Sequence, residues 1–359
     1  MELLQDSGGV FSEAFGASDG SSPKMKRGIL EWLRLYYGTD QRLQIPYTIV
    51  RKLISGVFCE YDAPGLKALP QREAMELALI CGESFLKPVP GGWKPISRGS
   101  ILVFSRDMWG EPTDVGLMEK TALGRHKFTL LERRTLAPDG TLTIVNRLFR
   151  SQGSGLGREV SLKSHPAYGE LPARFTYPQA MDSVGLIRLK TPMTNCVDGS
   201  AEGVSIYAPA AGLIAALEEN ESQLDSEFRN GQSRLVVSRD LLDAGQLKDT
   251  VFVALDESPE NVGITVFSPQ LRQESYLQRQ QAYLRVVENI IGLRRGLLSS
   301  VEETDRTATE ITCSEGDYMA TLVALRQVWE EAVEKASRLQ EALTGQPLDT
   351  QIAWGDGVL

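Results

Sequence analysis

The sequence predicts an α+β protein. Segments in which apolar residues recur with a helical period open and close the chain, whereas short β-rich runs separated by Gly and Pro fill residues 82–185. Such a separation of helices from strands is typical of α+β folds built on antiparallel sheets. The 359 residues suffice for one large domain or for two to three ordinary ones.

The N-terminal part of the chain contains an arm and three helices. Residues 1–23 are rich in Gly, Ser and Asp, and we expect them to form a flexible N-terminal arm. Apolar spacing then predicts helices over 25–38 and 47–58. Pro70 opens a third helix, which stops at Gly82.

The middle of the chain has a β-type period. Residues 101–104 form one expected strand, and the runs 127–132 and 141–146 form two more. Pro138-Asp139-Gly140 lies between these two runs and is a typical turn sequence, so the pair predicts a β-hairpin. We therefore expect an antiparallel sheet domain in 82–185, with helices packed at its start.

A further helix, a strand-rich segment and another helix follow. Pro209 begins the first helix, and Gly231 ends it. Strand-like runs follow at 234–237, 250–255 and 263–267, and a helix is expected from Gln270 to Ile291.

The last element is a long helix with a heptad seam. Thr307-Ala308-Thr309-Glu310 fits a capping box, and Gly316 is expected to kink the helix before the seam begins. A helix from Thr307 to Leu343 would be roughly 55 Å long. A stripe this narrow must pack along other helices, which could belong to copies of the same chain. The seam residues recur at spacings of three and four: Leu322, Leu325, Trp329, Ala332, Ala336, Leu339 and Leu343.

Composition excludes several classes of protein. The net charge of −9 disfavours a protein that coats DNA non-specifically. The four cysteines form no Cys-x-x-Cys pair, which leaves zinc ribbons and thioredoxin-type motifs without support. No apolar run approaches the length of a membrane span, and the first residues lack the pattern of a secretory signal.

The motifs that could carry catalysis are all incomplete. Gly153 to Arg158 is glycine-rich but lacks the Lys and hydroxyl of a phosphate-binding loop, so we interpret it as a flexible loop. Ser161, Ser164 and His165 lack a nucleophile elbow. Acidic clusters fall on predicted helix surfaces or in a loop, where solvated charge is the usual state. We therefore expect no catalytic residue, no metal and no cofactor.

Basic residues lie after the second-last helix and along the long helix: Arg294, Arg295, Arg326, Lys335 and Arg338. They could form ion pairs on the helix surface, because acids lie three to five residues from several of them. They could instead contact phosphates inside a channel, where an oligomer would repeat each contact many times.

A series of short motifs, in order and with matching spacing, resembles tailed-bacteriophage portal proteins. The form that it resembles is the siphophage and prophage type called a minor structural or capsid protein. The resemblance spans about residues 25–354. The motifs are Trp32 with Leu35–Gly38, Asn146–Phe149, Gly203–Ala210, Ser226–Gly231, Phe267–Arg272, Glu288–Leu293 and Thr307–Ile311.

The resemblance implies a portal-like architecture. Residues 24–205 would form a mixed α/β wing domain with an antiparallel sheet, and 206–231 a helix leading to the stem. Residues 232–300 would contain a small α/β clip, and 301–345 would form a long, kinked stem-to-tunnel helix. Residues 346–359 would be a short end, with the crown minimal or absent.

The resemblance also implies a function. Portal subunits form a ring, usually of twelve, at one vertex of the capsid in the virion, and they are made in the cytoplasm of the bacterial host. Double-stranded DNA passes through the ring during packaging and ejection. The expected partners are further copies, the major capsid protein, the terminase large subunit and the head–tail adaptor. Portals have no catalytic site, so the chain would not be an enzyme.

By this resemblance Arg326, Lys335 and Arg338 are candidates for the DNA channel, and Arg294 and Arg295 for partner docking at the clip. The seam residues Leu322, Leu325, Trp329, Ala332, Ala336 and Leu339 are candidates for oligomer contacts or for packing. The alternatives are a metal-dependent, phage-associated nuclease or hydrolase, and another head–tail assembly protein.

Overall fold

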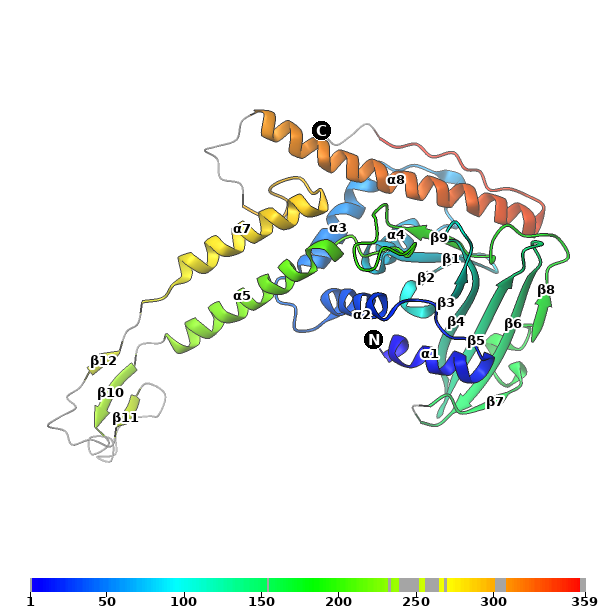
Figure 1. Ribbon diagram of the computed structural model, residues 1–359, viewed down its shortest axis with the longest axis horizontal. Coiled ribbons are helices and arrows are strands. Elements are labelled where there is room, and N and C mark those ends of the chain that lie inside the picture. The colour runs from blue at the N-terminus through cyan, green and yellow to red at the C-terminus, as the bar shows by residue number, and fades with distance from the viewer. Residues whose placement is uncertain are drawn as a thin grey trace. The chain divides into compact units, whose positions relative to one another are not determined.

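The chain forms seven α-helices and twelve strands in the part described by the computed structural model, a mixed α+β fold with antiparallel sheets (Figure 1). It divides into two compact units. Unit 1 comprises Met1–Ala211 and Glu288–Leu359, and unit 2 comprises Gly212–Val287. The structure describes residues 2–153, 155–231, 234–238, 252–255, 265–267, 270–300 and 308–355.

The three helices predicted near the start of the chain are present. They are α2 (Pro23–Tyr37), α3 (Ile45–Val57) and α4 (Gln71–Cys81). The Ser22 hydroxyl caps α2 by accepting a hydrogen bond from the Met25 amide at 3.2 Å. Gly82 ends α4 with a φ of +83°, and a Cβ there would lie 2.4 Å from the Gly203 backbone. Only glycine satisfies both conditions.

The prediction of a flexible arm at residues 1–23 is wrong, because Glu2–Phe15 form the helix α1. Phe11 of this helix is fully buried, and its ring centroid lies 5.6 Å from that of Phe104. Gly116 makes room for it, since a Cβ at that position would lie 2.5 Å from the Phe11 ring. The apolar face of α1 thus anchors it to the sheet.

Unit 1 contains a six-stranded antiparallel sheet, in the order β3-β4-β5-β6-β7 with β8 paired to β6. The predicted hairpin is confirmed, because β5 and β6 pair from Leu136↔Leu142 outward and Gly140 takes a φ of +83° in the turn. The strands are β3 (Ile101–Arg106), β4 (Pro112–Leu123), β5 (His126–Leu136), β6 (Leu142–Ser151), β7 (Arg158–Val160) and β8 (Arg174–Thr176).

A smaller antiparallel sheet, in the order β2-β1-β9, completes unit 1. Its strands are β1 (Glu83–Val89), β2 (Gly92–Ser97) and β9 (Ile187–Lys190). Phe85 of β1 packs with Val103 of β3 and Val115 of β4 in one buried cluster. This shared core joins the two sheets.

The long helix α8 (Ala308–Thr344) runs without interruption through Gly316, so the expected kink is wrong. A Cβ on Gly316 would meet nothing within 4 Å, so the structure does not require glycine at this position. Thr307, the expected capping residue, lies outside the described residues. After α8, which belongs to unit 1, Ala353 pairs with Asp62 in a β-bridge.

Unit 2 contains most of two helices and a three-stranded sheet. Helix α5 (Ala211–Asn230) precedes the sheet, and α7 (Gln273–Ile291) follows it. Within the unit the end of α5 lies beside the start of α7, because Glu227 pairs with Arg272 at 3.0 Å and the Asn220 amide donates to the Tyr276 carbonyl at 3.2 Å. The helices are therefore antiparallel neighbours.

The sheet of unit 2 lies between α5 and α7 in sequence. Its central strand β10 (Arg234–Ser238) is parallel to β11 (Phe252–Leu255) and antiparallel to β12 (Thr265–Phe267). The three strands fall where the sequence predicts them. The boundaries expected at 206–231 and 232–300 differ from the observed division, since residues from Glu288 onward belong to unit 1.

Candidate functional site

A buried ion cluster surrounds Glu83 at the start of β1. The Glu83 carboxylate is fully buried and accepts a hydrogen bond from the Gly203 amide at 2.6 Å. Three guanidinium groups face it: Arg188 of β9 forms an ion pair with it, Arg106 lies at 3.3 Å, and Arg98 at 4.0 Å. Strands that are distant in sequence thus meet at one carboxylate.

The surrounding charges keep Glu83 ionised. Burial by itself would raise the pKa of this carboxyl group, but Arg188, Arg106 and Arg98 together lower it from 4.5 to about 2. Arg98 is itself held by Glu202, whose carboxylate lies 3.0 Å away, and by the Ser21 hydroxyl at 2.6 Å. The cluster is thus a compensated network whose members depend on one another.

The same arginines hold the tip of the β3–β4 hairpin. Arg106 and Arg188 both donate to the Gly110 carbonyl, at 2.9 and 3.0 Å. The Asp107 carboxylate accepts hydrogen bonds from the amides of Trp109 and Glu111 at 2.8 and 2.9 Å, which closes the turn. Through these two arginines the ion cluster fixes the backbone of the β3–β4 turn.

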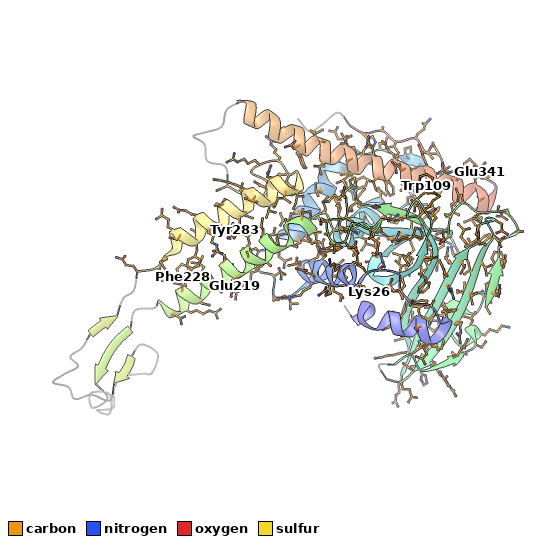
Figure 2. All side chains as sticks on the ribbon, in the orientation of Figure 1. Lys26, Trp109, Glu219, Phe228, Tyr283 and Glu341 are labelled. Atoms are coloured by element: carbon orange, nitrogen blue, oxygen red, sulfur yellow. The ribbon has the colours of Figure 1, made fainter. Side chains whose placement is uncertain are left out.

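This rigid turn presents two large apolar side chains to solvent. Met108 is 87% exposed and Trp109 is 81% exposed, the two highest values among the large apolar side chains of the described residues. Figure 2 labels Trp109. Isolated exposed apolar residues are common, but a pair held on an anchored turn is typical of a contact surface.

The three channel candidates of α8 are distributed over two places. Lys335 lies 3.3 Å from Glu111, and Arg338 lies 3.8 Å from Asp182. Both line a hollow of about 200 Å³ together with Arg188. Arg326 lies apart from that hollow: it donates to the Val57 carbonyl at 3.3 Å and stacks over the Trp354 ring.

A second hollow, of about 630 Å³, lies beside Lys335 and carries mixed charge. Arg188, Lys190 and Lys335 line it together with Glu111 and Glu331. Burial, and then the neighbouring Arg188, lower the pKa of Lys190. Cations thus gather along this edge of α8, each close to an acidic neighbour.

The two docking candidates do not share a unit with the three-stranded sheet. Arg294 pairs with Glu315 of α8 at 2.9 Å, and both it and Arg295 belong to unit 1. The sequence grouped them with the strands of 232–300 because they follow closely in the chain. The end of α7 instead returns the chain to unit 1.

The seam of α8 is buried within unit 1. Leu325, Trp329 and Ala336 are fully buried, and Leu322, Ala332 and Leu339 are at most 3% exposed. The indole of Trp329 donates to the Tyr61 hydroxyl at 3.1 Å and meets Phe58 edge to face. The seam is therefore a packing surface in this chain, and a second copy is not needed to cover it.

The weaker motifs have structural roles. His165 is buried and stacks on Tyr168 with 4.6 Å between ring centroids. The glycine-rich run at 153–158 joins the antiparallel strands β6 and β7, a setting without the helix that a phosphate-binding loop requires. Among the described residues no group of three His, Cys, Asp or Glu side chains could hold a metal ion. Nor is any helix of the described part long and apolar enough to span a membrane.

Sequence reasoning missed the ion cluster and the exposed turn. The cluster joins residues 83, 98, 106, 188 and 202, and no local pattern connects such distant positions. The turn did leave a signal, because Asp107-Met108-Trp109-Gly110 combines turn-forming ends with two apolar residues between strands.

No protein-family model matches this chain, and no curated protein matches it in sequence. The resemblance to portal proteins, read from the order and spacing of sequence motifs, therefore stays a prediction.

Proposed function

We propose that the chain is the subunit of a portal ring, the conduit for DNA at the single portal vertex of a tailed-phage capsid. The observation that carries this proposal is the topology of unit 2. Two antiparallel helices, joined through a small mixed sheet, are inserted between Ala211 and Glu288 of unit 1. The portal-like motifs Gly203–Ala210 and Glu288–Leu293 lie at the two ends of this insertion.

The proposal assigns regions to the two units. Helices α5 and α7 form the stem, and strands β10 to β12 form the clip that docks the terminase large subunit and later the head–tail adaptor. Unit 1 is the wing, whose outer surface meets the major capsid protein. This assignment moves the stem from α8 to α5 and α7, because the seam of α8 is buried within unit 1.

The charges of α8 fit weak contact with passing DNA. Each tightly held phosphate would slow translocation, since phosphate contacts dominate affinity for DNA. Lys335 and Arg338 already lie near Glu111 and Asp182, so any phosphate contact would compete with these acids. In this proposal Lys335 and Arg338 are the channel candidates, whereas Arg326 stabilises the packing around Trp354. The ring acts as a structural conduit without a catalytic site of its own.

The number and location of copies in a particle test this function. Antibody labelling of tailed particles assembled with this chain should mark a single vertex, and quantitative mass spectrometry should give about twelve copies per particle. Label at many vertices or along the tail would contradict the proposal and favour another head–tail assembly protein.

A further inference from the structure

We propose that one end of the six-stranded sheet binds the phosphate backbone of double-stranded DNA. It is the end formed by the β4–β5 turn, the β6–β7 loop and the strand β7 (Figure 1). This surface is separate from the channel proposed above. Each subunit carries it complete, so binding there does not depend on the ring.

Six cationic side chains gather at this end of the sheet, which is referred to below as the basic end. The register places Arg150 of β6 directly opposite Arg158 of β7, and Lys127 of β5 pairs with the residue that follows Arg150. The segment after β7 folds back onto the same part of the sheet, where Leu162 packs against the buried cluster that contains Phe128. The six cations are Lys120, Arg125, Lys127, Arg150, Arg158 and Lys163.

The positive charge of the basic end is not neutralised by acidic side chains. None of the six cations forms an ion pair within the part of the chain that the structure describes. The nearest acids along the strands have other partners, since Glu119 pairs with Lys94 and Glu159 with Arg147. Glu170, farther along the chain, is exposed and pairs with none of the six. A chain with a net charge of −9 thus carries a local excess of positive charge.

The pairing of Arg150 with Arg158 indicates that this excess serves an anion. Side chains directly opposite each other on neighbouring strands lie about 5 Å apart at Cβ, and like charges in such a pair destabilise the sheet. An anion bound between the two guanidinium groups would replace this repulsion with two charge-assisted hydrogen bonds.

The other groups at the basic end favour phosphate as that anion. Proteins contact DNA phosphates through Arg, Lys, hydroxyl groups and backbone N–H groups. A Cβ on Gly153 or Gly155 would meet nothing within 4 Å, so a ligand can approach the backbone of the β6–β7 loop closely. Exposed hydroxyl groups of Ser161 and Ser164 lie near Lys163 along the chain. Leu123 is the one exposed large apolar side chain among the described residues here, whereas the core of a protein interface is largely apolar.

The shape of the basic end favours a duplex over a single strand. Single strands are held by aromatic rings on which the bases stack, but Phe128 and Phe149 at this end are buried. The β4–β5 turn is a tight two-residue turn in which Gly124 takes a φ of +61° and Arg125 lies at the tip. The major groove of DNA admits a two-stranded β-ribbon, so the turn can enter it while Arg150 contacts the backbone.

The cations of α8 form a separate set. Lys335 lies beside Glu111, just before β4 begins. The basic end lies at the other end of this 12-residue strand, about 37 Å farther on. Exposed charges more than about 10 Å apart are largely screened at 0.1 M salt, so the basic end acts independently of α8 and of the net negative charge.

Binding of covalently closed circular duplex DNA tests this surface, because a preformed ring cannot be threaded onto a closed circle. Filter binding by the full-length chain should detect a complex at 50 mM salt. The logarithm of the binding constant should fall linearly with the logarithm of the salt concentration, with a slope of about −5 for six phosphate contacts.

A double variant and a matched control locate the contact. Arg125→Gln combined with Arg158→Gln removes two exposed cations of the basic end. The slope should become shallower by about 2, and the binding constant at 0.1 M salt should fall about 60-fold. Arg51→Gln combined with Lys52→Gln removes two exposed cations of α3, changes the net charge equally and should leave both values unchanged. Urea unfolding of each variant would establish that the fold is intact.

Four results would overturn the DNA surface. They are no binding of circular duplex by the wild type at 50 mM salt, equal losses in the two double variants, tighter binding of a single-stranded circle, and a loss confined to Lys335→Gln with Arg338→Gln. Binding of polyglutamate without binding of DNA would also overturn it, and would assign the basic end to an acidic protein partner. Rings that fail to bind circular DNA leave the proposed function standing, whereas a monomer that binds it through the basic end contradicts the ring alone.

Discussion

Replacement of Glu83 by Gln should destabilise unit 1 strongly. Gln keeps the size of the side chain and an oxygen that can accept from the Gly203 amide, but it removes the negative charge. Arg188, Arg106 and Arg98 would then share a buried site without their common counter-ion. Uncompensated buried charge is among the most costly changes that a folded protein can undergo.

The magnitude follows from the pKa of Glu83. A carboxyl group whose pKa falls from 4.5 in the unfolded chain to about 2 in the folded protein contributes about 3 kcal/mol at neutral pH. Loss of one partner from a buried ion pair costs about 3–5 kcal/mol in other proteins, which agrees. We expect Glu83→Gln to lower the free energy of unfolding by about this amount.

Urea unfolding at pH 7, followed by circular dichroism, measures this loss. The matched control is Asp182→Asn, because Asp182 pairs with Arg338 at the surface with 66% of its side chain exposed. Exposed pairs contribute about 0–1 kcal/mol, so the control should be nearly neutral. A loss below about 1 kcal/mol in Glu83→Gln would refute the reasoning about the cluster.

The free energy of unfolding of Glu83→Gln should depend on pH differently from that of the wild type. Because the folded pKa of Glu83 is depressed, its contribution is complete above pH 4.5 and is lost as the pH falls toward 2. The wild type should therefore lose about 3 kcal/mol more than Glu83→Gln over this interval. Parallel curves for the two proteins would show that the arginines do not stabilise the ionised carboxylate.

Two further substitutions test the packing of unit 1. Trp329→Ala removes a fully buried indole and its hydrogen bond to Tyr61, and should cost about 3–5 kcal/mol in urea unfolding; a loss below about 1 kcal/mol would mean that the seam of α8 is not packed in solution. Phe11→Ala should likewise cost about 3–5 kcal/mol and expose α1 to limited proteolysis, whereas unchanged protection would show that the helix does not depend on its contact with Phe104.

Local signals explain why most elements were predictable. The β5–β6 hairpin follows from its alternating strands and from the Asp139-Gly140 turn, all within 26 residues of sequence. Gly82 ends α4 with a φ of +83°, as the sequence indicated, and Gly292 follows the predicted helix end at Ile291 with a φ of +73°. In each case the residues that specify the element are close neighbours along the chain.

The features that escaped prediction depend on distant partners. Helix α1 is secured by Phe104 and Gly116, about 90 to 105 residues farther along the chain, so its own composition suggested a loose arm. The apolar seam of α8 predicted that the helix packs against other elements. The sequence could not show that α3 and Tyr61 of the same chain provide this packing surface. The sequence placed Arg326, Lys335 and Arg338 together on one helix, and only the fold separates Arg326 from the other two.

The mass and shape of the purified full-length chain test the central claim most directly. Native mass spectrometry, with negative-stain imaging of the same sample, should show closed rings with a central hole and about twelve times the mass of the 39.5 kDa chain. A stable monomer or dimer at micromolar concentration, with no ring in the images, would contradict the account.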